Sequence, residues 1–393
     1  MFGSIYIGLS GLAAYSRGLQ QISNNVANLN SQGFKGSTVS FENVLGANGR
    51  SNGGYSDTAG NGVRNGTSRL DFAQGELRQT DRDLDLAIQG NGLMMLMRGN
   101  DVAYTRTGSF EVDKQGFIVL SGTDWRLATL DAAGQPQTLS VDTSRTSPPQ
   151  ATTKVVFSDN LSSSATSAVT VGSIAVYDST GAKHVWQAKF EKDTSATATP
   201  GSWTVTVTDD QGATIGTQTL KFLGGAVDPS TSTLTFTDAA SSTSVAFDFS
   251  TGVSSYSGGD VSTLRAASTD GYATGTFATL GVNDKGQVEI GYSNEQKQQF
   301  GSVAIADFRD TSQLTQQAGG LFTASETAQR DLLPSGDTRV GQVQSRRLEA
   351  SNVDLTLEFS DLILVQRGFQ ASSQIISVTN DMIQQLFGIR GQG

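Results

Sequence analysis

Apolar residues recur at helical spacing at the two ends of the chain and at strand spacing between them. Residues 1–29 carry one such line, in which Ser16 and Ser23 fill the remaining positions and the apolar members are Ile5, Leu9, Leu12, Leu19 and Val26. This pattern predicts a helix. Glycines at positions 3, 8, 11 and 18 each weaken it by about 1 kcal/mol relative to Ala, so we expect packing to order it.

The last apolar stretch, Ser351 to Ile389, predicts a second and longer helix. Ser351 and Asp354 fit the two ends of a capping box at its start. One heptad-like line consists of Leu355, Phe359, Leu362, Phe369, Ile376, Ile383 and Phe387, and a broadening line consists of Leu364, Val365, Ile375, Val378, Met382 and Leu386. A helix of ~55 Å with so broad an apolar surface needs a partner, and the N-terminal helix matches it.

The pairing of these helices has two interpretations. They form a coiled coil that closes one domain within the chain, or they pack against copies of themselves. The glycine-weakened N-terminal helix favours the second, because it implies order gained on assembly. Which of the two C-terminal lines faces its own chain stays open at this point.

Between the ends, the apolar period changes to two from Leu70 onward. Residues 105–119 and 275–292 have the signature of hairpins, and Pro148-Pro149 marks the start of a Thr/Ser/Val-rich region of alternating strands. The predicted fold is mainly β with paired long terminal α-helices, in an elongated and nested multidomain architecture. Its parts are a terminal helical coiled-coil domain (1–32 and 349–393), an extended linker or arm (33–70 and 335–348), an inner β domain (71–145 and 266–334) and an inserted outer β domain (146–265).

The arm contains a stretch rich in Gly, Asn and Ser that predicts irregular or extended structure. We interpret it as a candidate hinge or contact between copies, with Gly46, Gly53, Gly54, Gly60 and Gly66 as its flexible points. A mobile surface loop is the alternative.

Composition excludes several classes of function. A formal charge of -10 argues against nucleic acid as a partner, since nothing in the sequence could neutralise a run of phosphates. The chain has no cysteine, which excludes disulfides and cysteine sites. No stretch approaches the ~18 apolar residues of a membrane span. No secretory signal is visible either, because such a signal begins with basic residues and the first basic residue here is Arg17. Composition alone would therefore indicate the cytoplasm.

Candidate chemistry is sparse. The acidic run Asp81–Asp85 lacks the Gly and Glu that a calcium loop requires at its positions 6 and 12, where Leu86 and Gly92 stand. The single histidine, His184, lies among alternating apolar residues and is interpreted as a strand residue. No dinucleotide or phosphate-binding motif and no Ser/His/Asp set stands out. We therefore predict no catalytic, cofactor-binding or metal-binding residues, and a protein that is not an enzyme.

Several longer motifs resemble the hook proteins of the bacterial flagellar rod–hook axial family. They are GLSGLAAYSRGLQQISNNVANLNSQGFK (8–35), RDLDLAIQGNGLMML (82–96), TRTGSFEVDKQGFIV (105–119), DGYATGTF (270–277), VNDKGQVEIGYSNEQKQQFGSVAIADF (282–308) and LEASNVDLTLEFSDLILVQRGFQASSQII (348–376). They cover both ends and both inner segments in the family's order, whereas residues 146–265 carry little of the likeness. QRGFQ (366–370) and TDWRLATLD (123–131) depart from the usual pattern of the family.

The resemblance implies a structural role. Many copies would stack helically into a curved, flexible tube, a universal joint that transmits torque from rod to filament. The paired helices would line its channel. The implied partners are copies of the chain, rod and hook–filament junction proteins, the hook cap and the type III export apparatus, and the implied location is the extracellular flagellar hook, reached without a cleaved signal peptide.

Two alternatives compete with this interpretation. A distal rod subunit of the basal body shares the terminal motifs, but rod proteins are generally shorter and lack a large inserted β domain. A secreted adhesin or carbohydrate-binding protein is suggested by the Thr/Ser-rich middle, and it predicts saturable glycan binding by residues 146–265.

Overall fold

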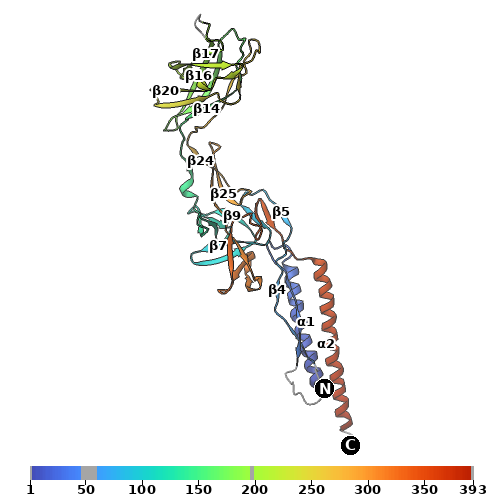
Figure 1. Ribbon diagram of the computed structural model, residues 1–393. Helices are drawn as coiled ribbons and strands as arrows, with labels where there is room; N and C mark the ends of the chain where they lie inside the picture. The colour runs from blue at the N-terminus through green and yellow to red at the C-terminus, as the bar shows by residue number, and fades with distance from the viewer. Residues whose placement is uncertain (1, 46–59, 195–198, 391–393) are drawn as a thin grey trace, which may run out of the picture. The chain divides into compact units, whose positions relative to one another are not determined.

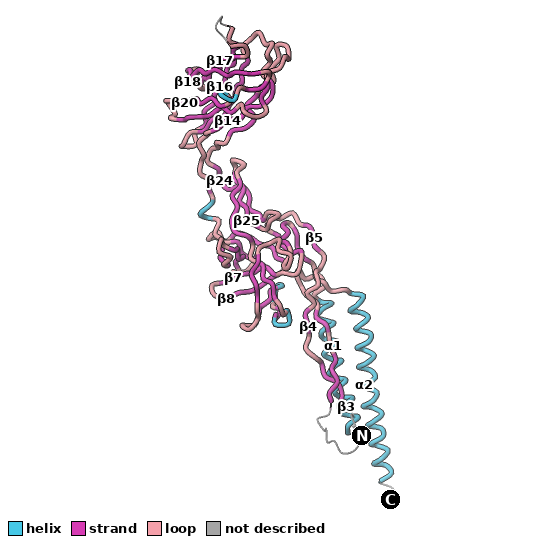
Figure 2. The backbone as a smooth tube through the Cα atoms, viewed as in Figure 1, coloured by secondary structure: helices cyan, strands magenta, loops and turns pink. Residues whose placement is uncertain are grey.

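The computed structural model describes residues 2–45, 60–194 and 199–390. These residues form a mainly β protein with one helix near each end of the chain (Figures 1 and 2). The chain divides into two compact units, a first made of residues 1–142, 280–289 and 298–393 and a second made of residues 143–279 and 290–297. The second unit is thus inserted in the first, while the finer four-part division stays a prediction.

The first unit contains both helices, α1 (Phe2–Ala27) and α2 (Leu355–Arg390), which lie side by side (Figure 1). Its strands before the insertion are β1 (Ser37–Thr38), β2 (Phe41–Leu45), β3 (Gly60–Asn65), β4 (Arg69–Leu70), β5 (Leu77–Gln79), β6 (Asp85–Gln89), β7 (Leu93–Arg98), β8 (Asp101–Thr105), β9 (Thr107–Val112), β10 (Ile118–Leu120), β11 (Arg126–Leu130) and β12 (Pro136–Thr138). Its later strands are β26 (Lys297–Ser302), β27 (Ile305–Phe308), β28 (Leu314–Gln316), β29 (Leu321–Ala324), β30 (Arg330–Leu333), β31 (Gln342–Ser345) and β32 (Arg347–Glu349).

Most of these strands join one 12-stranded sheet of order β28-β29-β8-β7-β11-β10-β9-β6-β31, with β12 on β11, β27 on β7 and β30 on β27. The predicted hairpin at 105–119 is confirmed as β9 and β10, in which Ile118 pairs with Val112. Asp113 closes its turn, because the Asp113 carboxylate accepts hydrogen bonds from the N–H groups of Gln115 and Phe117, both at 2.8 Å. Alternating apolar residues of these strands form a buried core that includes Leu93, Tyr104, Ala128 and Phe322.

The second unit is a β domain built around a 10-stranded sheet of order β15-β16-β17-β18-β19-β22-β14-β21-β20, with β23 on β14. Its strands are β13 (Thr146–Ser147), β14 (Lys154–Asn160), β15 (Val169–Tyr177), β16 (Lys183–Lys192), β17 (Ser202–Thr208), β18 (Thr214–Leu223), β19 (Ala226–Val227), β20 (Thr233–Asp238), β21 (Thr243–Asp248), β22 (Val253–Ser254) and β23 (Arg265–Thr269). The boundary between the units passes through β24 (Gly275–Val282) and β25 (Gln287–Tyr292). Trp186, Phe190, Trp203, Phe157 and Phe247 fill one aromatic-rich core.

Two predicted details of secondary structure change. The capping box at Ser351–Asp354 is not formed: α2 begins later, with Asp354 accepting a hydrogen bond from Thr356 N–H at 2.7 Å. Residues 351–354 stay outside the helix because the Asn352 side chain is hydrogen-bonded to three backbone groups, those of Gly36, Asp71 and Ala73. The arm also contains more structure than predicted, since β2 pairs antiparallel with β3, which lies within the glycine-rich stretch.

Candidate assembly site

The two helices contact each other through small residues of α1. A Cβ atom added to Gly8 would lie 2.8 Å from Ile376 Cγ1, and one added to Gly11 would lie 2.6 Å from Ser372 Oγ. On the other helix, the Tyr15 ring lies over Gly368, where an added Cβ would approach it to 2.4 Å. The glycines that lower the helicity of α1 therefore allow close approach of α2. We call this contact the glycine seam.

The side of α2 that faces α1 repeats every seven residues. Val365, Ser372 and Thr379 are buried, and Leu362, Ile376 and Ile383 are half-buried between them. Thr379 donates a hydrogen bond from its hydroxyl to Ile375 O at 2.7 Å, which satisfies that polar group within the helix. The inner side of α2 therefore takes Leu362, Ile376 and Ile383 from the first predicted line and Val365 from the second.

The remaining members of the predicted lines lie elsewhere. On α1, Ile5, Leu12, Leu19 and Val26 are half-buried and Leu9 is 58% exposed. On α2 the exposed members of the first line are Leu355, Phe359, Phe369 and Phe387. The assembly role of all these residues is not tested by the single chain and stays a prediction.

Most of the second predicted line is uncovered. Leu364 is 66% exposed, Met382 is 54% exposed, and Ile375, Val378 and Leu386 are also exposed. Leu357, 65% exposed, continues the same line toward the start of the helix. These six residues follow spacings of 7, 11, 3, 4 and 4, which keep them on one side of a helix, and we call them the outer stripe.

A second segment covers part of α1. In the β2–β3 hairpin, Val63 N–H donates to Ser10 Oγ at 3.2 Å and the Asn65 side chain donates to Ala14 O at 3.1 Å. The Phe41 ring packs on Tyr15 with ring centroids 5.3 Å apart. Of the five glycines predicted as a hinge, Gly60 begins β3 and Gly66 N–H donates to Ser40 O at 2.9 Å, whereas Gly46, Gly53 and Gly54 lie outside the described residues.

A buried ionic cluster holds the inner ends of both helices to the β sheet. Glu349, six residues before α2, lies 2.6 Å from Lys35 Nζ through one carboxylate oxygen and 3.0 Å from Arg106 Nε through the other. All three side chains are 0% exposed. Lys35 follows α1, and Arg106 stands between β8 and β9, so one carboxylate joins three separate segments. We call these residues the helix-root cluster.

Backbone groups make further hydrogen bonds with this cluster. Arg106 donates to the carbonyls of Gly90 and Gly92, Lys35 Nζ donates to Ala73 O at 2.6 Å, and Gly75 N–H donates to Glu349. Burial lowers the pKa of the Lys35 ammonium, and the neighbouring Glu349 opposes that shift. Each member of this buried cluster is hydrogen-bonded, and removal of Glu349 would leave buried cations without their anion.

Asn25 of α1 makes a second polar contact, which joins α1 to the segment at Ser37 and to the first turn of α2. Its side-chain amide donates to Ser37 O at 2.9 Å and to Glu358 Oε1 at 2.8 Å, and its oxygen accepts from Ser37 N–H at 3.1 Å. Burial raises the pKa of Glu358, the Asn25 hydrogen bond opposes that shift, and the neighbouring Asp361 adds to it. Asn25 is buried in α1 although it is polar. The spacing of apolar residues gives no sign of this contact, because it records apolar side chains alone.

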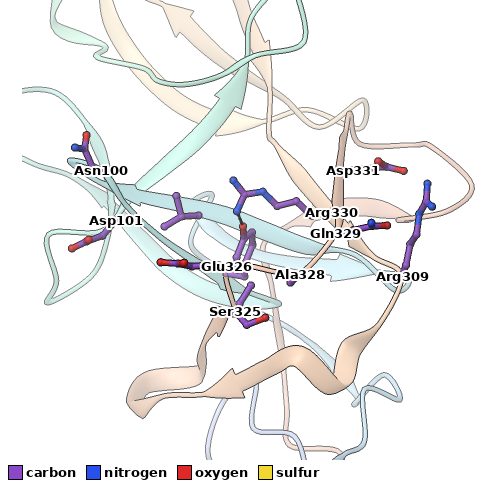
Figure 3. Close-up of a pocket in the computed structure, with 12 residues that line it drawn as sticks. Asn100, Asp101, Arg309, Ser325, Glu326, Ala328, Gln329, Arg330 and Asp331 are labelled. Carbon is purple, nitrogen blue, oxygen red and sulfur yellow. Dashed lines mark hydrogen bonds between the residues drawn. The ribbon is translucent and has the colours of Figure 1, made fainter.

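One cavity of the first unit is large enough to hold a small-molecule ligand. It has a volume of about 910 Å³ and lies among β8, β30 and the segment after β29 (Figure 3). Carboxylates of Asp101, Glu326 and Asp331 line it together with Arg309 and Arg330, and Arg330 donates a hydrogen bond to the Tyr104 hydroxyl. The side chains that line the cavity include no nucleophile paired with a base, so the cavity indicates no particular chemistry.

No metal or membrane site emerges from the part of the chain that is described. Those residues contain no group of three His, Cys, Asp or Glu side chains arranged to hold a metal ion. His184 lies in β16, as predicted for a strand residue, with its Nε2 3.3 Å from Asp178 Oδ2. Neither described helix is long and apolar enough to cross a membrane.

Comparison with known protein families gives three matches. The model described as "Flagella basal body rod protein" matches residues 5–35, which contain most of α1 and Lys35. The model "Flagellar hook protein FlgE/F/G D1 domain" matches residues 87–142, and "Flagellar basal body rod FlgEFG protein C-terminal" matches residues 344–389. The three members of the helix-root cluster fall one in each matched region.

Similarity to individual proteins extends over almost the whole chain. The flagellar hook protein FlgE of Salmonella typhimurium is 29% identical over 419 residues, covering 97% of this chain and 98% of that protein. The hook protein FlgE of Treponema pallidum is 26% identical and covers 99% of this chain and 100% of that protein. Among solved structures, Helicobacter pylori flagellar hook protein FlgE2 has a similar fold, with a TM-score of 0.50 and 12% identity over 70% of this chain and 99% of that chain.

The family matches include most of both terminal helices and part of the 12-stranded sheet, and the full-length likeness includes the inserted second unit. Each full-length relative named above is a hook protein, so a rod protein is the less supported alternative. The chain is therefore similar over almost its whole length to bacterial flagellar hook proteins, and three of its segments match models of the flagellar rod–hook family.

Proposed function

We propose that the chain is a structural subunit of the bacterial flagellar hook, which polymerises helically into a curved, flexible tube and transmits torque from rod to filament. The outer stripe of α2 is the observation that carries this proposal. α1 and α2 already pack against each other through the glycine seam, yet six aliphatic or Met side chains of α2 stay exposed. So large an apolar surface favours association with further helices.

The helix-root cluster gives this subunit a stiff connection. Torque applied to the terminal helices reaches the sheet through Lys35, Arg106 and Glu349, which are buried and paired with one another. Polar surfaces of the β units supply the contacts that slide during bending, because Thr and Ser side chains do not fix one register as an apolar surface does. Such a division between stiff and sliding contacts suits a universal joint.

The remaining features of the proposal follow from the family. The role of hook proteins is structural, and we propose no catalytic activity for this chain. The proposed partners are other copies, the rod, the hook–filament junction proteins, the hook cap and the type III export apparatus. The proposed location is the extracellular part of the flagellum, reached without cleavage of a signal peptide.

Substitution in the outer stripe tests the proposal. We expect the double variant Leu364→Ser and Met382→Ser to remain a folded monomer but to require roughly a hundredfold more protein for salt-induced tube formation, since each side chain loses at least about 1.5 kcal/mol of burial. The control is Gln370→Ser with Gln374→Ser, which makes the same number of serines at exposed positions of α2. Equal tube formation by both double variants, scored by electron microscopy and sedimentation, would overturn the assignment of the outer stripe.

A further inference from the structure

A small cavity in the first unit contains two arginine side chains. Its volume is about 350 Å³, and its lining includes Arg69 of β4 and Arg309, which follows β27. Neither guanidinium group makes a hydrogen bond or an ion pair with any other residue that the structure describes. Both side chains are exposed, so a solute can reach them. We call this cavity the Arg69–Arg309 pocket.

The one acid that lines the pocket is engaged by its own neighbours. One carboxylate oxygen of Asp310 accepts from Ser312 N–H at 3.0 Å and from Ser312 Oγ at 2.6 Å, and the other accepts from the Gln313 side chain at 3.4 Å. These hydrogen bonds lower the pKa of Asp310, and the charge of Arg69 adds to the shift. The pocket therefore keeps two cations against one carboxylate, although the whole chain has a formal charge of -10.

Arg309 also lines the 910 Å³ cavity, and the acids there do not neutralise it. Asp101 and Asp331 are each in an ion pair with another arginine, at 3.3 and 3.2 Å. The third carboxylate, that of Glu326, lies on the opposite side of that cavity from Arg309 (Figure 3). The positive charge of Arg309 is therefore available to a ligand of the smaller pocket.

The donors of the pocket suit oxyanions. The hydroxyl groups of Ser68 and Thr311 also line it, and neither makes a hydrogen bond within residues 2–45, 60–194 and 199–390. Guanidinium groups bind carboxylate or phosphate oxygens through two parallel N–H bonds, and hydroxyl groups donate to the same oxygens. A volume of about 350 Å³ is at the lower end of the range for small-molecule sites. The pocket therefore fits a small compound with two oxyanion groups, one for each arginine.

The two arginines belong to segments with different supports. Arg69 lies in the arm, where β4 pairs with β1 and Ser37 of β1 is hydrogen-bonded to Asn25 of α1. Arg309 follows β27, which pairs with β7 of the 12-stranded sheet. Two cations in one pocket repel each other, whereas an anion between them attracts both. A bound anion would therefore tie the arm to the sheet through residues outside the helix-root cluster.

We propose that the Arg69–Arg309 pocket binds a small compound with two phosphate or carboxylate groups, and that binding stiffens the connection between the arm and the sheet. The inference does not depend on assembly, because all of the pocket residues lie in the first unit of one chain. It goes beyond the proposed function, because it adds a ligand to a protein whose proposed role is structural.

Calorimetric titration of the monomer with pyrophosphate, which carries two phosphate groups, tests the binding. Sodium chloride holds the ionic strength constant, so general screening does not change. We expect one site per chain, weakened at least about tenfold by Arg69→Ser or Arg309→Ser, the usual effect of losing a hydrogen bond to a charged group. The control is Arg78→Ser, which removes an exposed arginine of β5 outside the pocket. No binding by the unsubstituted chain, or an equal loss in all three variants, would overturn the proposal.

Hydrogen exchange tests whether the ligand stiffens the connection. Asp71 N–H donates to Gly36 O beside Arg69, and Leu314 N–H donates to Thr311 O beside Arg309. At ten times its dissociation constant, pyrophosphate should slow the exchange of both amides about tenfold, because opening of the pocket requires release of the ligand. Inorganic phosphate at the same concentration and ionic strength is the control, since it has one group and should slow them less. Binding without slowing, or equal slowing by both anions, would contradict a ligand that bridges the two arginines.

Discussion

Glu349 shows how much of the assembly depends on a single side chain. Its two carboxylate oxygens bind residues 314 and 243 positions away, so the cluster joins segments from the beginning, the middle and the end of the chain. Lys35, Arg106 and Glu349 lie in three separate motifs of the sequence, and no pattern in those motifs indicates that they pair. Charges that far apart have no local pattern, and only the fold brings them together.

Removal of the Glu349 charge should destabilise the first unit strongly. We expect Glu349→Gln to lower the free energy of unfolding by about 3–5 kcal/mol, because Lys35 and Arg106 would remain as buried cations without an anion. The measurement is urea unfolding followed by the helical signal in circular dichroism. The control is Glu76→Gln, whose exposed partner Arg78 lies at 3.2 Å and whose loss should cost less than about 1 kcal/mol. Similar losses for both variants would contradict the anchoring role.

The stability of the folded protein should depend on pH through the ionisation of Glu358. Its pKa is raised in the folded protein, so the folded state binds the proton more tightly and stability decreases as pH rises from the unfolded value near 4.5 through the raised pKa. Glu358→Gln keeps an oxygen to accept from Asn25 but cannot ionise. We therefore expect the stability of this variant relative to the unsubstituted chain to increase from pH 4 to pH 7, as measured by thermal unfolding. A difference that is constant with pH would show that Glu358 does not carry the effect.

At the scale of elements, α1 explains why apolar spacing alone could not assign the contact. The predicted line from Ile5 to Val26 correctly indicates a helix, and the structure gives α1 from Phe2 to Ala27. The contact face, however, contains Gly8, Gly11 and Gly18, which a hydrophobic pattern counts as gaps. Close approach of two backbones depends on the absence of a side chain. Hydrophobicity does not record that property, so the side of the helix that meets α2 could not be predicted.

Two substitutions in α1 should have opposite effects. Gly11→Leu should separate the helices, because even a Cβ there meets Ser372 Oγ at 2.6 Å. Gly3→Ala should stabilise α1 by up to about 1 kcal/mol, since nothing lies within 4 Å of an added Cβ at that position. Hydrogen exchange of α1 amides measures both changes. Faster exchange in Gly3→Ala, or unchanged exchange in Gly11→Leu, would disagree with the glycine seam.

At the scale of the whole molecule, the order of the segments could be predicted better than their contacts. Period-two alternation and the Pro148-Pro149 boundary predicted a mainly β chain with an inserted β region, and the second unit does interrupt the first. The resemblance of the terminal motifs supplied the family. What neither could supply is the β2–β3 hairpin on α1, which depends on side-chain contacts such as Asn65 with Ala14 O. Pattern reasoning detects periodicity, and these contacts have none.

Helical reconstruction of the polymer by electron cryomicroscopy tests the proposed subunit role most directly. The full-length chain should form curved tubes in high salt, in which the glycine seam joins α1 and α2 of one copy while Leu364, Met382 and Leu386 contact helices of neighbouring copies. The opposite result would be tubes in which the outer stripe touches no other copy, or a protein that stays monomeric under every assembly condition. Either outcome would contradict a hook subunit assembled through the outer stripe.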